Sequence, residues 1–454
     1  MSTAAERTRA KGFVQRFGRD AVAWQGLESG CRYWFGDDAC VAYVDTGAAW
    51  VAAGSPWCEA ARVEGVAAAF VVAARTVGKR ACFFGVEDRH LWPGMERLLL
   101  GQQATFAPGS WEAAVAGHRR LREQLRRARK KGVRVRRAGA ADLREGSELR
   151  ARVDAVADAW LRARRLEPMG FLVSLEPFAF AEAHRYYVAE LGDTVVAFTS
   201  LVPVPQRGGW LVEDSFRHQS APNGTAELVL DAVVRDAGGA FVALGLAPLA
   251  GPVPSLLRVA GTLARPLYDF RSLEAFRRRL HPGAWEGVWM LYPAGGRARV
   301  VFAVVDALRA FAGGSLVAFG WRSFWRRPSV LPWVLAVPLV PWTVVLAVLA
   351  VIDDGALMGF SRAALVAWVA WDGVLAVLLF RAARRPTRRK LWALATAAAI
   401  DASLSLVHLL RVGLGTTAVA AGLRLAGAVA PVCGALGLAW AAGRAAPAVR
   451  RRAP

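Results

Sequence analysis

The chain has 454 residues, 55% of them hydrophobic, and its 58 lysines and arginines against 36 acidic residues give a formal net charge of +22 at pH 7. A charge of this size points to a polyanionic partner, either nucleic acid or the anionic face of a membrane, and a mean hydropathy of +0.29 is high for a soluble protein. The cysteine usage argues against a zinc centre or a disulfide framework, because no CxxC or Cys/His cluster occurs among Cys31, Cys40, Cys58, Cys82 and Cys433, and we expect no metal.

The first 296 residues have the pattern of a mixed α/β globular region. The N-terminal sequence "MSTAAERTRAKGFVQRFGRD" has no apolar core, so we expect no signal peptide. Short β-rich segments then alternate with helical patterns, which predicts sheets covered by helices. The region is too long for one small α/β domain, and we expect two domains, at residues 1–111 and 112–296. The expected strands include 81–86, 186–191, 195–204 and 241–247, and the expected helices are 59–77, 112–131, 142–164 and 225–237.

A strongly basic segment, residues 118–137, opens the second expected domain, and Glu123 is its only acidic residue. On a helix its positive charges would fall on all sides, whereas a solvated helix normally mixes charges of both signs. We therefore expect the segment to bind phosphate groups of a nucleic acid or of anionic lipid, two partners that the sequence does not separate. The alternative is a merely solvated surface. The residues selected for phosphate contact are Arg126, Arg127, Lys130 and Lys131.

The densest group of polar residues lies between Glu213 and Glu227, before an expected helix. Carboxylates suit an ammonium group, and a guanidinium binds phosphate bidentately. His218 is either a proton acceptor or a structural hydrogen-bonding residue. The sequence "PNGT" at 222–225 predicts a turn with Thr225 as the helix N-cap. This turn either directs backbone N–H groups at an anion or is an ordinary turn.

Beyond residue 328 the sequence predicts a membrane domain, residues 329–454, with four transmembrane helices. The apolar stretches 329–352, 363–380, 391–410 and 416–442 are each near the roughly 20 residues that cross a bilayer. Arginine-rich segments flank the bundle and the connection between its second and third helices. The positive-inside rule therefore places both ends of the bundle in the cytoplasm. Buried helices of a large soluble protein are the alternative.

Two further features belong to this part of the chain. Residues 297–328 form an apolar linker that carries Asp306 and Arg309, and we expect an amphipathic helix at the membrane surface rather than a fifth span. Asp372, Asp401 and Arg424 fall inside the expected spans. Ionisable groups in lipid either pair between helices or line a headgroup or transport site.

The motif "RHQSAPNGTAELVLDAVV" (217–234) is followed by "ALGLAPLAG" (243–251). Together these motifs resemble the catalytic domain of the phosphatidylglycerol lysyltransferase (multiple peptide resistance factor) family. Other pieces agree in order over roughly residues 31–293. They are "ACVAYVDTGAAWVAAGSPW" (39–57), "HRRLREQLRRARKKGVRVR" (118–136), "ADAWLRARRLEPMGFLVS" (157–174) and "LEAFRRRLHPGAWEGVWMLYP" (273–293).

The resemblance implies an α/β fold of tandem acetyl-CoA N-acetyltransferase-like domains, here followed by the four-helix membrane region. It also implies a transferase that moves an aminoacyl group from aminoacyl-tRNA onto a lipid hydroxyl such as that of phosphatidylglycerol. An aminoacyl ester is already activated, and no P-loop or dinucleotide motif occurs, so we expect no cofactor. The chain departs from the family at Ala226-Glu227, where members have Met-Asp, and at Arg277, where they have Lys. Well-known members also carry a large flippase region ahead of the catalytic domain, whereas here the membrane part is smaller and follows it.

On this basis the partners are aminoacyl-tRNA, anionic phospholipid and the membrane, with the catalytic region on the cytoplasmic side. The alternatives are a coenzyme A-dependent N-acyltransferase at the membrane, disfavoured because no R/Q-x-x-G-x-G/A loop follows a strand, and a non-catalytic scaffold that binds anionic lipid. The expected catalytic residues are Asp214, Arg217, His218 and Glu227. The expected substrate-binding residues are Glu167, Phe171, Glu213, Asn223, Gly224, Thr225 and Arg277.

Overall fold

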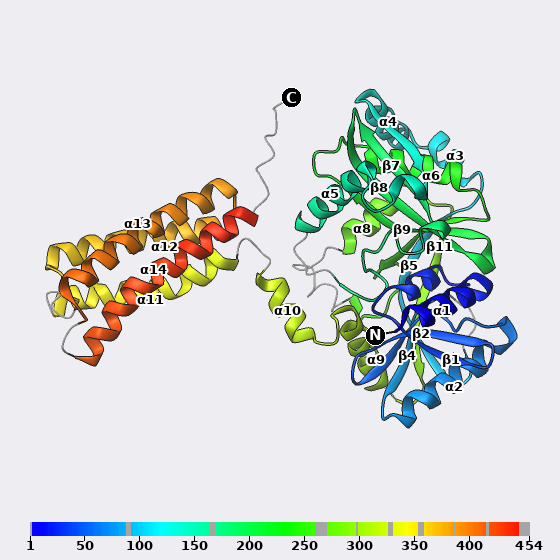
Figure 1. Ribbon diagram of the computed structural model, residues 1–454, viewed down its shortest axis with the longest axis horizontal. Helices are drawn as coiled ribbons and strands as arrows, with labels where there is room; N and C mark the ends of the chain where they lie inside the picture. The colour runs from blue at the N-terminus through cyan, green and yellow to red at the C-terminus, as the bar shows by residue number, and fades with distance from the viewer. Residues whose placement is uncertain are drawn as a thin grey trace. The chain divides into compact units, whose positions relative to one another are not determined.

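The computed structural model describes residues 2–87, 92–163, 169–255, 257–258, 270–296, 298–325, 330–352, 358–384, 386–414 and 417–444. The chain divides into two compact units, Met1–Phe319 and Gly320–Pro454 (Figure 1).

The first unit is built on one continuous sheet of 11 strands in the order β1-β2-β3-β4-β11-β5-β10-β9-β8-β7-β6. All four expected strands are present, as β4, β7, β8 and β10. Helices cover the sheet (Figure 1), so the predicted α/β class is confirmed. The strands are β1 (Arg32–Gly36), β2 (Ala39–Asp45), β3 (Ala49–Ala53), β4 (Arg80–Val86), β5 (Met95–Phe106), β6 (Val133–Ala138), β7 (Arg185–Leu191), β8 (Thr194–Val204), β9 (Gly209–Arg217), β10 (Val242–Pro248) and β11 (Ala284–Pro293).

The sheet contains the same local unit twice, which fits the predicted tandem architecture. In each half an antiparallel meander leads to a parallel pair of strands joined by a helix: β3 and β4 through α2, and β9 and β10 through α6. The last strand, β11, returns to lie between β4 and β5. Because a strand from beyond residue 111 completes the first half, the two halves share one sheet, and the expected boundary at residue 111 stays a prediction.

Helices pack on both faces of the sheet. One face, here called the α5 face, is covered by α1, η1 and α9 at its centre and by α5 at the β6–β9 end. The other, the α6 face, is covered by α2 in the first half and by α3, α4 and α6 in the second. The helices of this unit are α1 (Ala4–Phe17), η1 (Ala21–Leu27), η2 (Ala60–Arg62), α2 (Val63–Thr76), α3 (Ser110–Gly117), α4 (Arg119–Lys130), η3 (Ala140–Leu143), α5 (Glu148–Ala163), η4 (Ala181–Ala183), η5 (Pro205–Arg207), α6 (Thr225–Ala237), α8 (Phe270–Arg278) and α9 (Ala298–Phe311).

Local sequence explains most helix limits. The expected helix 225–237 is α6, which ends where Gly238 takes a positive φ of 61°. The expected single helix 112–131 is instead two, because His118 adopts an extended conformation (φ −116°, ψ 103°) directly after Gly117. Glycine has low helix propensity, and the break turns α4 away from α3.

The expected interfacial linker forms two helices, α9 and α10 (Leu316–Trp325), bent by 51°. The inner side of α9 packs on the sheet, where Asp306 is 1% exposed and makes a bidentate ion pair with Arg80 at 2.7 Å. Its outer side exposes Val301, Phe302 and Leu308, each about half accessible. Since α9 belongs to the globular core, only its outer side is available to a membrane, and the interfacial role stays a prediction.

Among the described residues, the second unit contains four helices that are long and apolar enough to cross a membrane. The bent pair α9–α10, whose first helix belongs to the first unit, would add a fifth span if it counts as one. These four match the predicted spans, and the chain is accordingly a membrane protein. Which side of the membrane each loop faces remains a prediction. The helices are α11 (Val330–Ile352), α12 (Arg362–Arg384), α13 (Arg388–Val412) and α14 (Ala418–Arg444).

Candidate functional site

A β-bulge places two of the predicted carboxylates side by side. In the pairing of β8 with β9, Thr199 faces Ser215 and Leu201 faces Val212, so Glu213 and Asp214 together oppose one residue, Ser200. Neighbouring side chains on a regular strand point to opposite faces, but a bulge redirects them and is common next to active sites. Both carboxyl groups therefore meet partners on the α5 face.

Asp214 is held by Ser200. The Asp214 backbone N–H donates to Ser200 Oγ at 3.1 Å, and the Ser200 hydroxyl donates to Asp214 Oδ2 at 3.2 Å. Only 9% of Asp214 is exposed. Burial, followed by the nearby charge of Glu213, raises the pKa of Asp214 to about 8. A carboxyl group in this state is protonated at neutral pH and ionises readily when a cation approaches.

Glu213 pairs with His184, which the sequence did not identify. His184 Nδ1 donates to the carbonyl oxygen of Phe180 at 3.0 Å, and Nε2 lies 3.1 Å from Glu213 Oε2. Burial alone lowers the pKa of His184, but the hydrogen bond and charge of Glu213 outweigh it and the net shift is upward. The ring also stacks on Tyr186, with 5.7 Å between ring centroids. An acceptor oxygen at each ring nitrogen fixes the orientation of His184, and the upward shift of its pKa favours the protonated ring.

Two more carboxylates come from distant segments. Glu28, directly after η1, is 7% exposed, and burial raises its pKa to about 8. Its neighbour Glu176 accepts hydrogen bonds from the backbone N–H and hydroxyl of Ser29 and forms an ion pair with Arg7 at 2.9 Å. Burial would raise the pKa of Glu176, but the hydrogen bonds from Ser29 and the charge of Arg7 lower it overall.

We call Glu28, Glu176, Glu213 and Asp214 the carboxylate cluster. Arg7 and His184 neutralise Glu176 and Glu213. Within the described part of the chain, Glu28 and Asp214 form no ion pair, and burial is the main cause that raises the pKa of each to about 8. Buried carboxyl groups without a counter-ion are suited to bind a cation, because the incoming charge replaces the proton that burial retains.

The other predicted residues of this region lie apart from the cluster. Phe216 packs on the α5 face, so Arg217 projects toward the α6 face, where it is exposed and its guanidinium donates to the Ala221 carbonyl at 3.5 Å. His218 Nδ1 accepts the backbone N–H of Ser220 at 3.2 Å. The proton of a neutral His218 ring is then on Nε2, which makes it a donor and does not favour the expected role as proton acceptor. The polar residues of the segment 213–227 are thus divided between the two faces of the sheet.

The PNGT turn joins α6 to the basic helix α4. Gly224, with φ of 91°, is the N-cap of α6, so the expectation that Thr225 is the N-cap is wrong by one residue. Thr225 is instead the first helical residue, and its hydroxyl donates to the Pro222 carbonyl at 2.7 Å. A Cβ on Gly224 would lie 2.2 Å from the carbonyl oxygen of Gln124 in α4, so only glycine permits this approach.

Two other predicted residues lie in this turn and the helix it opens. Asn223 is exposed in the turn, and Glu227 is half-buried in the first helical turn of α6.

The basic helix has one buried side. Leu121, Leu125 and Ala128 pack into the core, so the expectation that charge surrounds the helix is wrong. Arg126 bonds to Glu123 at 3.1 Å, whereas Arg127, Lys130 and Lys131 are exposed and form no ion pair within the described ranges. An open depression of about 490 Å³ lies beside Gln124, the residue that contacts the PNGT turn. It is lined by Arg119, Arg120, Glu123, Gln124 and Arg127.

Three remaining predictions have different outcomes. Arg277 donates to the carbonyl oxygens of Leu244 and Gly245, the latter at 2.7 Å, where β10 bulges away from its regular pairing with β5. It therefore holds the backbone of β10 in this structure. Phe171 is buried against Phe84 and Phe311. Glu167 lies outside the described residues.

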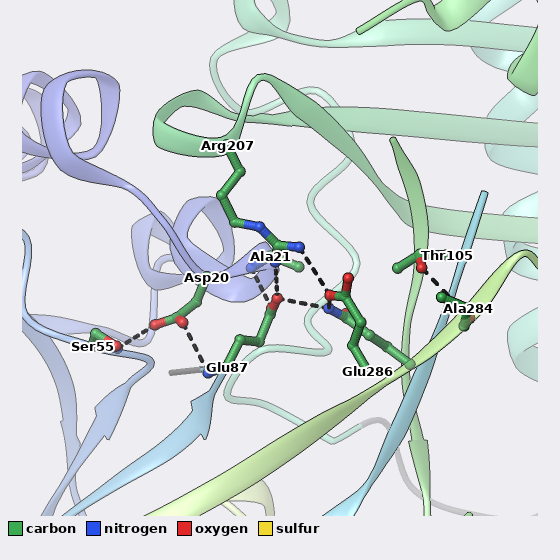
Figure 2. A network of polar contacts seen from close by, with 9 residues as sticks. Asp20, Ala21, Ser55, Glu87, Thr105, Arg207, Ala284 and Glu286 are labelled. Carbon is green, nitrogen blue, oxygen red and sulfur yellow. Dashed lines mark hydrogen bonds and ion pairs between the residues drawn. The ribbon is translucent and has the colours of Figure 1, made fainter. Parts of the chain in front are cut away.

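A second buried network joins the two halves of the sheet (Figure 2). Asp20 accepts the backbone N–H groups of Ser55 and Glu87, and Glu87 accepts bonds from Ala21 and Gln103. Arg207, from the β8–β9 connection, bridges Glu87 and Glu286 of β11. Burial, followed by the charge of Asp20, raises the pKa of Glu87 to about 8. The 3-10 helix η1 lies between Asp20 and Glu28. The network therefore fixes the start of η1, and Glu28 at its other end belongs to the carboxylate cluster.

Sequence reasoning missed Glu28, Glu176, His184 and Arg7. They come from the N-terminal helices and from the segment before β7, and only folding brings them near Glu213. No local motif marks them. His184 next to the strand sequence "RYYVAEL" was the one available signal, since a histidine at the end of a buried strand is a candidate for a partnered role.

Comparison with known proteins identifies the family and the fold. A family model described as phosphatidylglycerol lysyltransferase, C-terminal, matches residues 11–292. The C-terminal domain of a protein assigned as a lysylphosphatidylglycerol synthetase from Agrobacterium fabrum aligns at 23% identity with a TM-score of 0.58, covering 69% of this chain and 99% of that chain. L-PGS from Bacillus licheniformis aligns at 19% identity with a TM-score of 0.57, covering 66% and 95% respectively. At these identities the structural likeness shows the fold alone. No curated protein matches the chain.

Proposed function

The chain belongs to the phosphatidylglycerol lysyltransferase C-terminal family and is a transferase, and we propose that it moves an aminoacyl group from aminoacyl-tRNA onto a hydroxyl of phosphatidylglycerol in its own membrane. The family assignment supports the lipid acceptor. The use of tRNA, the anchoring role of the helices and the cytoplasmic position of the first unit are parts of the proposal.

The observation that carries the proposal is the carboxylate cluster. An aminoacyl ester carries an α-ammonium group, and a lysyl ester carries a second one. Glu28 and Asp214 are two buried carboxyl groups without a cationic partner in the described part of the chain, set beside the fixed pair His184–Glu213. Such a site holds ammonium groups by charge-assisted hydrogen bonds and rejects uncharged acyl groups.

The donor phosphates would meet the α6 face. There the exposed side chains of Arg127, Lys130 and Lys131 lie on the helix that contacts the PNGT turn, and Arg217 is exposed at the end of β9. Arginine and lysine bind phosphate groups through charge and hydrogen bonds, and binding strength then depends on salt. His218 Nε2 would act as a hydrogen-bond donor to an oxyanion or phosphate.

The reaction itself is an ester exchange. The lipid hydroxyl oxygen attacks the carbonyl carbon of the aminoacyl ester, a new C–O bond forms, and the bond to the terminal ribose oxygen of tRNA breaks. The proton lost by the lipid hydroxyl is taken up by the departing ribose oxygen, so no cofactor is consumed. The protein's main contribution is then to hold both substrates in attack geometry and to stabilise the oxyanion.

A transfer assay with the full chain tests the proposal. Purified protein would be incubated with tRNA charged with radiolabelled lysine or alanine and with vesicles of phosphatidylglycerol or phosphatidylcholine, and the extracted lipid separated by thin-layer chromatography. We expect label in a new lipid only with phosphatidylglycerol, abolished by prior ribonuclease treatment and unaffected by coenzyme A. Absence of labelled lipid with either charged tRNA, or transfer that depends on coenzyme A, would overturn it.

A further inference from the structure

The membrane unit contains a cavity that the proposed reaction does not use. It has a volume of about 280 Å³, near the lower end of the range for small-ligand sites, and side chains of α11, α12, α13 and α14 line it. Most of the lining is apolar. The ionisable residues in it are Asp372, Asp401, His408 and Arg424.

Two carboxyl groups lie at the same depth of the bundle. Asp372 and Asp401 fall near the middle of α12 and α13, and they are 2% and 5% exposed. Oδ2 of Asp372 is fully buried and has no hydrogen-bond partner within the described residues. A buried, unsatisfied carboxyl oxygen in the middle of a membrane span is costly, so it marks a functional site more often than a structural one.

The other ionisable residues of the cavity do not neutralise this pair. Arg424 donates to the carbonyl oxygen of Gly413 at 3.0 Å, at the C-terminal end of α13. His408 Nε2 donates to the Met358 carbonyl at 2.9 Å, and its ring stacks on Phe360. Neither aspartate forms an ion pair with any residue that the structure describes, so the expected helix-to-helix ion pair is not formed.

The side chains that line the cavity favour a positively charged ligand. Carboxylates accept hydrogen bonds and attract a positive group, and a primary ammonium has three N–H donors with which to reach two carboxylates. Trp342, Trp368 and Phe360 also line the cavity, and aromatic faces attract cations. An anion would meet two carboxyl groups, and an uncharged hydrocarbon would leave Asp372 Oδ2 unsatisfied.

We propose that this cavity binds a primary ammonium group carried on a lipid, with Asp372 and Asp401 as its carboxylate ligands. A lipid is favoured over a free amine because both carboxyl groups lie at mid-depth in helices long enough to span a bilayer, where an occupant arrives from the hydrocarbon region. The aminoacyl lipid that the proposed reaction forms has this chemistry. Its identification as the natural occupant rests on the proposed function, whereas the ammonium site does not.

The test uses the full chain in phosphatidylcholine nanodiscs that contain equal amounts of lysyl-phosphatidylglycerol and phosphatidylglycerol. Native mass spectrometry of the released protein reports which lipid is retained. We expect the wild type to prefer the lysyl lipid by about tenfold, a difference of about 1.4 kcal/mol. Asp372→Asn and Asp401→Asn keep the side-chain shape and should each remove most of the preference. Ser403→Ala, at an exposed position of α13, is the matched control and should leave it unchanged.

A second measurement separates the two sources of ammonium. Thermal unfolding of the same samples is recorded with soluble lysine amide. Stabilisation of the wild type but not of Asp372→Asn, without any lipid preference, would overturn the assignment to a lipid and leave a free-amine site. A preference that survives in both aspartate variants would overturn the site itself, as would equal retention of both lipids with no stabilisation by lysine amide. Because the lysyl lipid is supplied, a failure of transfer activity does not affect the result.

Discussion

Replacing Asp214 by Asn should stabilise the protein at alkaline pH while it strongly decreases transfer. Asn has the shape of a protonated Asp, and Ser200 can bond to it in the same way. The buried environment that favours the neutral form of Asp214 therefore tolerates the substitution. The carboxylate that the substrate ammonium requires is lost, however.

The magnitude follows from the pKa of Asp214, which is raised from 3.8 to about 8 in the folded protein, by burial first. Below pH 4 both folded and unfolded forms carry the proton. Between pH 5 and pH 8 the unfolded chain has lost it and the folded chain retains it, so rising pH favours unfolding. Each pH unit in this window costs about 1.4 kcal/mol, so the wild type should lose about 4 kcal/mol of stability relative to the non-titrating variant.

The assay is thermal unfolding of the full chain in detergent at pH 5, 6.5 and 8, followed by near-ultraviolet circular dichroism. The unfolding midpoint of the variant should rise relative to that of the wild type by about 8 °C or more between pH 5 and pH 8, since 1 kcal/mol corresponds to roughly 2–4 °C for a domain of this size. Asp193→Asn, at an exposed turn position between β7 and β8, is the control and should follow the wild type. Parallel profiles for Asp214→Asn and wild type would show that Asp214 is ionised in the folded protein and would refute the reasoning.

Transfer by the same variant is the second half of the test. Loss of a charge-assisted hydrogen bond to the substrate ammonium should cost about 1.5–3 kcal/mol, roughly a 10- to 150-fold decrease in kcat/KM, or more if a charge is left buried and unpaired. Normal aminolipid formation by the Asp214→Asn variant would show that Asp214 does not belong to the substrate site, whatever the effect of the substitution on stability.

Three further substitutions or truncations test other parts of the molecule. Changing Arg126, Arg127, Lys130 and Lys131 together to Gln should flatten the salt dependence of tRNA binding by about three units of log–log slope, measured by fluorescence anisotropy, whereas an unchanged slope would mean that α4 is only a solvated surface. Gly224→Ala should lower the unfolding free energy by more than 1 kcal/mol, because its Cβ meets the Gln124 carbonyl at a positive φ; an unchanged denaturation midpoint would contradict the proposed α4–α6 contact. A fragment of residues 1–319 should unfold near the midpoint of the intact globular unit, and a fragment of residues 1–296 well below it, because the shorter one loses the Asp306–Arg80 ion pair and the packing of Phe311 on Phe84 and Phe171; equal midpoints would show that α9 is dispensable.

The elements that sequence predicted well are those set by local patterns. The expected helix 225–237 coincides with α6, and four apolar stretches correspond to α11–α14. Amphipathic periodicity and a run of about 20 apolar residues each depend on neighbours a few positions apart, so they are visible without a fold. The break at His118 was missed because the alanines before it and the arginines after it are good helix formers.

The carboxylate cluster was only half predictable, because it depends on strand register and on distant segments. Glu213 and Asp214 are adjacent in sequence, but whether they face the same side is decided by the bulge opposite Ser200, which no local signal marks. Glu28 reaches them through η1, whose start is fixed by the Asp20–Glu87 network. Conversely, Arg217 is three residues from Asp214 and yet points to the other face. Proximity in sequence therefore wrongly grouped Arg217 with the carboxylates and gave no indication of Glu28.

The division between faces resolves an electrostatic difficulty of a chain with a net charge of +22. Basic side chains that attract phosphates would also neutralise any carboxylates beside them, and carboxylates would repel the phosphates. Here the exposed basic residues of α4 lie on the α6 face. The carboxylate cluster lies on the α5 face, where Arg7 and His184 are its ion-pair partners among the described residues. If the proposed function is correct, the phosphates of the donor and the ammonium of its aminoacyl group are bound on opposite faces. The path between them would pass the end of β9, which pairs with β10 only at Trp210 and Leu211. Bulky substitutions at Val212, the first position beyond that pairing, should then slow transfer without weakening tRNA binding. If transfer and tRNA binding decreased by the same factor, the aminoacyl group would instead lie on the α6 face.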